Sequence, residues 1–337
     1  MIRRRKRLSA SEYIEGVLSG DRIRLSQAIT LIESELAADR KLALQVMDGC
    51  IAHSGKSIRV GVTGVPGVGK STFVDSWGEY LVEKGYKLAV LAIDPSSAHS
   101  KGSILGDKTR MHQLSQNPRA FVRPSPNSGS LGGVARKTRE SMLLCEAAGF
   151  DLLLIETVGV GQSELAVKSM TDFFLLLMLP NAGDELQGIK RGIMEMADAI
   201  FVNKADHEFE EAARRAKSRY AQAMRLLRQD ENWQVPVLTG SALHKKGMDI
   251  CLETLLAFKS HQEKLGNWKN QRKKQQMKWF NESMERELIR LFIEDVEVRA
   301  EIDRSKEMIE SFKRAPDSMA QEILQFWIKS LSYKKWE

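Results

Sequence analysis

The sequence predicts an α/β fold built on a mainly parallel, doubly wound sheet. Three observations support this. Short, continuously apolar runs alternate with helical stretches between residues 58 and 258, a glycine-rich loop follows the first run, and polar motifs follow several later runs. Continuous apolar runs are typical of parallel strands that helices cover on both faces. Residues that bind a ligand are then expected just beyond the carboxyl ends of the strands.

Six apolar runs are the predicted strands of this sheet. They cover residues 58–63, 88–93, 152–155, 173–179, 199–202 and 235–239. A helical stretch over residues 71–83 follows the first run. Alternation of strands and helices predicts right-handed crossovers between parallel neighbours.

Helical segments flank the predicted sheet on both sides. Residues 8–55 have helical spacing and predict two helices with a turn at residues 19–21. We therefore expect a helical extension over residues 1–56, an α/β domain over 57–260 and a helical arm over 261–337.

The predicted arm contains three helical stretches. The first has an apolar stripe, the second contains Met308, Ile309 and Phe312, and the third spans residues 319–331. The stripe consists of Met277, Phe280, Met284, Leu288 and Leu291. Such an arm packs either on its own α/β domain or on a second copy of the chain, and composition does not decide between the two.

Composition excludes several classes of protein. The 337 residues are 42% hydrophobic and 28% charged, as in a globular protein, and the net charge of +7 is modest. Acidic and basic residues alternate beyond a short basic start, which argues against a nucleic-acid partner. Three separated cysteines favour a reducing compartment, and no apolar run reaches the roughly 18–20 residues of a membrane span. We expect a cytoplasmic protein with no membrane partner.

The glycine-rich loop has the G-x-x-x-x-G-K-[ST] pattern of a phosphate loop, between a predicted strand and a predicted helix. Its glycines let successive backbone N–H groups turn toward phosphate oxygens at a helix N-terminus. We expect Lys70 to reach the β- and γ-phosphates and the Ser71 hydroxyl to bind Mg²⁺. The expected phosphate-binding residues are Gly64, Val65, Pro66, Gly67, Val68, Gly69, Lys70, Ser71 and Thr72.

Two further motifs predict that the base is guanine. Asn203-Lys204-Ala205-Asp206 follows the strand over 199–202, and the Asp206 carboxylate would accept hydrogen bonds from guanine N1–H and its amino group. Adenine offers no such pair of donors. The segment Ser241-Ala242-Leu243 follows the strand over 235–239, where a backbone N–H can donate to the guanine carbonyl.

A third motif, Glu156-Thr157-Val158-Gly159, follows the strand over 152–155. Glu156 is expected to hold Mg²⁺ directly or through water, and the Gly159 N–H to contact the γ-phosphate. The hydrolytic Gln of Ras-type proteins would follow that glycine, but Val160 stands there and Gln162 lies two residues on. We therefore expect slow intrinsic hydrolysis.

Two loop segments carry further candidates. Asp94, after the strand over 88–93, and Asp107 could serve the Mg²⁺ shell or orient the attacking water. The segment 181–192, after the strand over 173–179, is either a loop that moves with nucleotide state and touches a partner or a surface loop that opens a helix.

Together these segments resemble the MeaB/ArgK family of GTPases, which belong to the SIMIBI class of P-loop proteins. The resemblance covers about residues 11 to 258. It is carried by the phosphate loop and by residues 94–97, 103–111, 149–164, 183–192 and 203–206. The family often has a Gly-Gly pair before residues 103–105, where this chain has Lys101-Gly102.

The resemblance implies a G-protein chaperone of an adenosylcobalamin-dependent acyl-CoA mutase, above all methylmalonyl-CoA mutase. In this family, GTP binding and hydrolysis gate cofactor loading and protect the mutase. It also implies switch segments at 94–111, 156–164 and 184–190, and a homodimer formed through residues 263–337.

Two alternatives differ in class. Nickel-delivering metallochaperone GTPases carry Cys/His metal ligands near the nucleotide, whereas here the cysteines are isolated and His99 and His112 have no cysteine beside them. The second alternative is a nucleotide-regulated scaffold that has no useful hydrolysis. The intact Lys70, Ser71 and Glu156 argue against this alternative.

Overall fold

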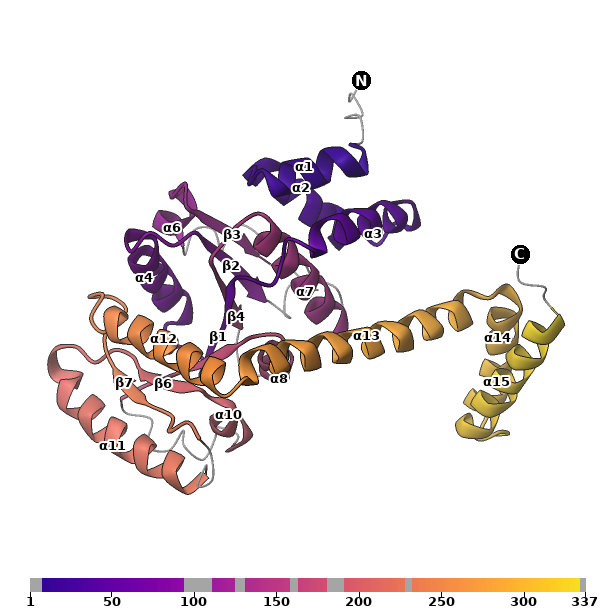
Figure 1. Ribbon diagram of the computed structural model, residues 1–337. Helices are drawn as coiled ribbons and strands as arrows, with labels where there is room; N and C mark the ends of the chain where they lie inside the picture. Colours follow the sequence, from indigo (N-terminus) through magenta and orange to yellow (C-terminus); the bar gives the residue numbers. More distant parts are fainter. Residues whose placement is uncertain are drawn as a thin grey trace. The chain divides into compact units, whose positions relative to one another are not determined.

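The computed structural model describes residues 8–93, 111–124, 131–157, 163–180, 191–227 and 232–333. The chain divides into two compact units, Met1–Lys269 and Asn270–Glu337. The first unit contains the N-terminal helices and the sheet, and the described part of the second consists of helices (Figure 1).

Three helices precede the sheet, where the sequence predicted two. They are α1 (Ala10–Leu18), α2 (Arg22–Glu33) and α3 (Ala37–Ile51). Ser9 and Glu12 form a capping box at the start of α1, and the Asp21 carboxylate caps α2. The additional break follows α2, because Ser34 adopts an extended backbone and its hydroxyl bonds the Asp39 carboxylate at 2.5 Å. Helices α2 and α3 pack against α7 (Leu131–Ala147), so the extension belongs to the first unit.

The sheet is parallel throughout the described residues. Its strands are β1 (Ile58–Gly64), β2 (Leu88–Ile93), β3 (Ala120–Pro124), β4 (Leu152–Thr157), β5 (Phe173–Met178), β6 (Ala199–Val202) and β7 (Val237–Thr239). Their order across the sheet is β3-β2-β4-β1-β5-β6-β7. The predicted α/β class with a parallel, doubly wound sheet is confirmed, and the six predicted strands are present with bounds shifted by at most two residues.

Strand β3 is not among the strands that the sequence predicted. It has five residues and ends in Arg123 and Pro124, which a central strand rarely tolerates. It lies at the edge of the sheet, where one side of the strand needs no hydrogen-bonding partner. The Arg123 guanidinium forms an ion pair with Glu33 of α2, which ties this edge to the N-terminal helices.

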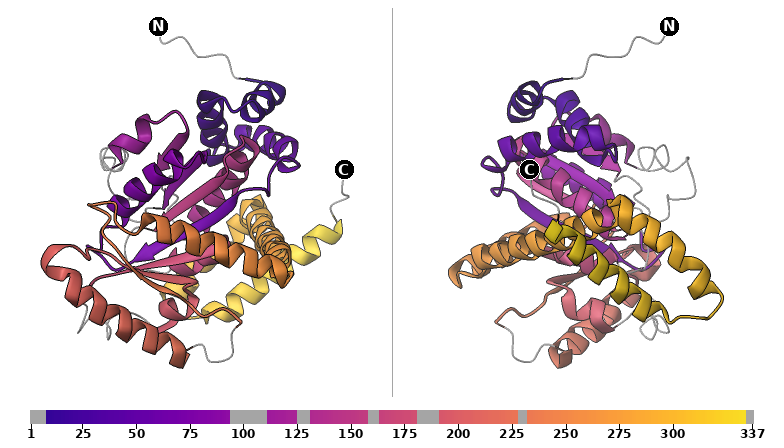
Figure 2. Two further views of the ribbon diagram at one scale, coloured as in Figure 1. Left: turned by 60° about the vertical axis from the view of Figure 1, so that its left-hand side comes forward. Right: turned by 90° about the vertical axis from the view of Figure 1, so that its right-hand side faces the viewer.

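Helices cover both faces of the sheet (Figures 1 and 2). Helices α4 (Lys70–Glu83) and α12 (Met248–Lys264) pack on one face, and α7 with α8 (Ser163–Lys168) on the other. Helix α11 (Glu210–Leu227) packs beside β6 and β7. Two short helices, α6 (His112–Gln116) and α10 (Arg191–Met196), and the turn η2 (His207–Phe209) complete the described part of this unit. Alternate strand residues therefore enter two separate apolar layers, as the continuous apolar runs predicted.

The C-terminal unit is formed by three helices. They are α13 (Asn267–Glu294), which begins within the first unit, α14 (Val296–Glu310) and α15 (Pro316–Tyr333). Its small core is built on Val298, Ile323 and Trp327. Phe312, which was expected in the second helical stretch, instead lies in the turn after α14 with φ 55° and is 96% exposed. Within the described chain, none of the helices has the length and apolar character needed to cross a membrane.

Candidate nucleotide-binding site

The phosphate loop joins β1, which ends at Gly64, to α4, which begins at Lys70. Gly67 and Gly69 have φ of 75° and 87°, left-handed conformations that side chains rarely adopt, so the loop backbone depends on glycine here. The Lys70 ammonium lies back over the loop and donates to the carbonyls of Gly64 at 2.8 Å and Val65 at 3.3 Å. The loop is thus a compact turn closed by its own lysine.

Burial lowers the pKa of Lys70, while the charges of Glu156 and Glu164 act in the opposite direction. A buried ammonium is stabilised by any anion brought close to it. The triphosphate of a nucleotide supplies such an anion, so this lysine fits a phosphate ligand.

Glu156 lies at the carboxyl end of β4, the neighbour of β1 in the sheet, and is 3% exposed. The Ser71 hydroxyl, in the first turn of α4, donates to Glu156 Oε1 at 2.8 Å. The carboxyl ends of β1 and β4 are also joined, because the Thr157 hydroxyl donates a 2.8 Å hydrogen bond to the Thr63 hydroxyl. The hydroxyl and the carboxylate are oxygen ligands of the kind that Mg²⁺ prefers. Water and nucleotide phosphates commonly fill the remaining coordination positions of Mg²⁺.

No group of three His, Cys, Asp or Glu side chains that could hold a metal ion occurs among the described residues. The Ser71 hydroxyl and the Glu156 carboxylate, at 2.8 Å, form a pair of oxygen donors whose chemistry fits an Mg²⁺ ion that a nucleotide helps to hold.

Asn203, directly after β6, links three loops. Its amide Nδ2 donates to the Val68 carbonyl of the phosphate loop at 2.8 Å, and its Oδ1 accepts from the Ala242 N–H at 2.9 Å. The next residue, Lys204, has φ 58° and its ammonium donates to the Gly67 carbonyl at 2.8 Å. The Asn-Lys-x-Asp segment is therefore bonded both to the phosphate loop and to the segment after β7.

Asp206 is held by the loop over residues 241–246, which we call the base loop. The Ser241 hydroxyl donates to Asp206 Oδ2 at 2.5 Å and accepts from the His244 N–H at 3.3 Å. The His244 imidazole Nε2 lies 3.8 Å from the same carboxylate oxygen. The carboxylate is thereby oriented before any ligand contacts it, which is what recognition of a flat hydrogen-bonding edge requires.

The base loop itself is closed by a backbone bridge between Ser241 and Lys246. Gly240 precedes it, and a Cβ at this position would lie 2.3 Å from the Lys246 carbonyl and 2.5 Å from the Phe201 ring, so the close turn requires glycine. Ala242 is buried at the turn, whereas the Leu243 side chain is 73% exposed.

The expected site residues thus fall into two groups. The structure brings together the phosphate loop, Glu156, the Asn203–Asp206 segment and the base loop, all at the carboxyl ends of strands. Asp94, Asp107, Gly159 and the segment 181–190 lie outside the described residues. The Thr63–Thr157 bond, the Lys204–Gly67 contact and the position of His244 were not foreseen, because each brings together residues that are distant in sequence.

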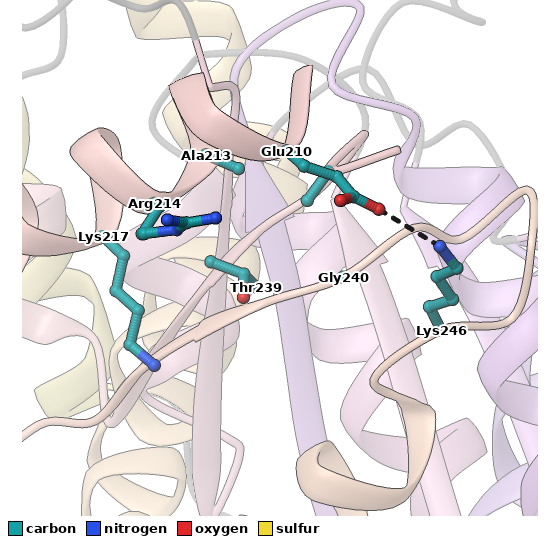
Figure 3. Close-up of a pocket in the computed structure, with 8 residues that line it drawn as sticks. Glu210, Ala213, Arg214, Lys217, Thr239, Gly240 and Lys246 are labelled. Atoms are coloured by element: carbon teal, nitrogen blue, oxygen red, sulfur yellow. Dashed lines mark hydrogen bonds and ion pairs between the residues drawn. The ribbon is translucent and has the colours of Figure 1, made fainter. Parts of the chain in front are cut away.

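A separate pocket of about 350 Å³ lies between α11 and the segment after β7 (Figure 3). It is lined by Ala205, Glu210, Ala213, Arg214, Lys217, Thr239, Gly240 and Lys246. Asn203 and Asp206 are not among its lining residues, although Ala205 of the same segment is.

A parallel sheet, a phosphate loop that opens a helix, and an Asn-Lys-x-Asp segment bonded to that loop define the class of P-loop GTPases. The model of the family described as methylmalonyl-CoA mutase-associated GTPase MeaB matches residues 25–297. The chain belongs to this family, and it is a GTP hydrolase.

Individual relatives agree with this assignment. A protein of Mycobacterium tuberculosis named as a probable GTPase is 50% identical over 78% of this chain and 79% of its own length. The mitochondrial methylmalonic aciduria type A homolog of Mus musculus is 41% identical over 92% of this chain and 77% of its own. The crystal structure of a LAO/AO transport system kinase has a TM-score of 0.72 and 34% identity, and the match covers 94% of this chain and 97% of that one.

Proposed function

We propose that this GTPase acts as a G-protein chaperone of an adenosylcobalamin-dependent acyl-CoA mutase, with methylmalonyl-CoA mutase as the first candidate. In this proposal the nucleotide cycle gates loading of the cofactor and protects the mutase. The main observation that supports this proposal is the match of residues 25–297 to a family described as mutase-associated. The likeness to the mammalian methylmalonic aciduria type A homolog over 92% of the chain supports it.

In the proposed site, GTP lies along the carboxyl ends of β1, β4, β6 and β7. The phosphate-loop backbone and Lys70 bind the phosphates, and Asp206 with the Ala242 segment selects guanine. Ser71 and Glu156 would hold Mg²⁺, which neutralises charge on the phosphates when bound. Asp94, Asp107 and the Gly159 N–H remain proposed contributors from segments outside the described residues.

We propose slow intrinsic hydrolysis that the mutase stimulates. The chain has Val160 after Gly159, where Ras-type GTPases have the glutamine that orients the attacking water. The water must then be positioned by another group, which a partner-dependent rearrangement can supply.

Homodimerisation through the C-terminal unit is also proposed. The stripe of α13 predicted from the sequence is exposed, since Met277, Phe280, Met284, Leu288 and Leu291 are 46–58% accessible. Apolar rows of this kind are more stable when a second helix covers them. Leu288→Lys should shift the chain from dimer to monomer in sedimentation velocity, whereas Glu285→Lys should leave the dimer intact. A wild-type monomer at micromolar concentration would refute the proposal.

The three cysteines are free and buried, which fits the cytosolic location that we propose. Burial raises the pKa of all three thiols, which supports the proposed mutase role over a nickel site built on their thiolates.

The function is tested by GTP turnover of the purified protein alone, with a purified methylmalonyl-CoA mutase and its cofactor, and with Ni²⁺. We expect slow basal turnover, stimulation by the mutase and no effect of nickel. Lys70→Ala should lower turnover by a factor of about 10² or more in each case. Stimulation by nickel without the mutase would favour metal delivery, and no stimulation by any cobalamin mutase would refute the proposal.

A further inference from the structure

Two neighbouring lysines connect the base loop to two different helices. Lys245 forms an ion pair of 2.7 Å with Glu79 of α4, and Lys246 forms one of 3.3 Å with Glu210 of α11. Helix α4 begins at the phosphate-loop lysine, Lys70. The Lys245 contact therefore joins the loop that holds Asp206 to the helix that begins in the phosphate loop.

The two ion pairs differ in their surroundings. The Glu79 side chain is 15% exposed, whereas Lys246 and Glu210 are 58% and 56% exposed. Figure 3 shows the Lys246–Glu210 pair at the rim of the pocket beside α11. An ion pair whose two side chains are both exposed contributes little to stability. When one of the two side chains is partly buried, water and salt screen the attraction less. The Lys245 pair is thus expected to be the stronger constraint.

The face of α4 that Lys245 meets is acidic. Asp75, Glu79 and Glu83 recur at intervals of four residues, which places them in one row on the helix. The hydrogen bond to Glu79 raises the pKa of Lys245, and the charges of Glu79, Glu83 and Asp75 add to this effect. Lys245 therefore remains cationic and offsets repulsion within the row.

The backbone of Lys245 is also unusual. Its φ of 53° lies in the left-handed region, which costs a residue with a side chain about 1 kcal/mol or more relative to ordinary conformations. A lysine in this conformation is retained only where surrounding contacts compensate for it. The pair with Glu79 is one such contact, in the same loop whose Ser241 hydroxyl bonds Asp206.

We propose that Lys245 is a positioning residue for guanine recognition, and that its ion pair with Glu79 sets the base loop, with Ser241 and Asp206, against the phosphate-loop helix. The inference rests on the proposed base contacts of Asp206 and Ala242. It concerns contacts to the base and not to the phosphates, so loss of the pair should weaken binding of guanine nucleotides selectively.

The test compares Lys245→Ala with Lys246→Ala, a matched removal of one lysine from the same loop that keeps its backbone bridge. Binding of Mg·GDP is measured by calorimetry, and binding of Mg·ADP by competition. Lys245→Ala should weaken GDP binding about tenfold and ADP binding less than twofold, with a raised KM for GTP and kcat within twofold. Lys246→Ala should change GDP affinity by less than twofold.

Three further variants separate the ion pair from folding and from backbone strain. Lys245→Arg should keep most of the affinity, and Glu79→Gln should reproduce the loss with the helix intact. Lys245→Gly relieves the left-handed backbone but removes the ammonium, so it should still weaken GDP binding. Glu79→Lys combined with Lys245→Glu should recover at least half of the loss on a logarithmic scale.

Two results would overturn the proposal. Equal, small effects of Lys245→Ala and Lys246→Ala would show that the pair does not position the loop. Equal losses of GDP and ADP affinity in Lys245→Ala and Glu79→Gln would show a general structural role. Failure of the proposed base contacts is recognised separately, because the wild-type protein would then bind ADP as tightly as GDP.

Discussion

The Ser71 hydroxyl and the Glu156 carboxylate are hydrogen-bonded at 2.8 Å, so the first turn of α4 is tied to the carboxyl end of β4. These residues come from segments 85 positions apart, and the adjacency of β1 and β4 in the sheet brings them together. Of the oxygen donors proposed for Mg²⁺, they are the two that lie within the described residues.

Ser71→Ala should therefore raise the Mg²⁺ concentration for half-maximal GTP turnover by about ten- to hundredfold, because one donor at the metal is lost. Glu156→Gln keeps the size of the side chain but removes its charge, and it should have a similar effect. Turnover is titrated with Mg²⁺ at saturating GTP. An unchanged Mg²⁺ dependence in both variants would remove the pair from the metal site.

Asp206→Asn should weaken binding of GDP and shift preference toward xanthosine diphosphate. The amide presents a donor where the carboxylate accepts, and xanthine carries a carbonyl in place of the guanine amino group. A loss of about two hydrogen bonds to a charged acceptor corresponds to at least a hundredfold in affinity. Calorimetry with both nucleotides measures the preference, and unchanged GDP affinity would place Asp206 outside the base pocket.

Arg59 and Glu146 form a buried bidentate ion pair, with nitrogen–oxygen distances of 2.8 and 2.9 Å and no exposed surface on the Glu146 side chain. Arg59→Met should lower the free energy of unfolding by about 3–5 kcal/mol, since the carboxylate stays buried without its cation. Arg59→Met combined with Glu146→Leu should recover much of this loss. Urea unfolding measures both, and equal stability of the single and double variants would contradict the prediction.

The three thiols should be unreactive in the native protein. Burial raises the pKa of Cys50 to about 11 and raises those of Cys145 and Cys251 further. Native protein at pH 8 should therefore react slowly with a thiol reagent, and unfolded protein should react at all three positions. Rapid native labelling of one or more cysteines would contradict this.

The same shifts affect stability at alkaline pH. An unfolded thiol ionises near pH 8.5, below the pKa of each folded thiol, so above this pH the native state binds more protons than the unfolded state. The contribution of the cysteines to the free energy of unfolding is fully present below about pH 8.5. It is lost as the pH rises through the pKa values of the folded thiols. Urea midpoints measured between pH 7 and 10 should decrease accordingly.

Much of the fold and part of the candidate site could be predicted from local sequence. The runs at Leu88–Ile93 and Ala199–Val202 were predicted with the bounds that the structure has, because strands buried on both faces are apolar at every position. The phosphate loop was evident because its glycines and lysine act within one turn. Strand β3 was missed because an edge strand tolerates Arg123 and Pro124, which hide it from an apolar pattern.

The sequence by itself determined the class of the sheet, the phosphate loop and the guanine-type motif, since each depends on residue types at short, regular spacing. Only the tertiary structure decided that Asn203 joins the phosphate loop to the base loop, that Ser71 meets Glu156, and that Lys245 meets Glu79. These pairs are set by strand order and by loop conformation, which bring together side chains that are far apart along the chain.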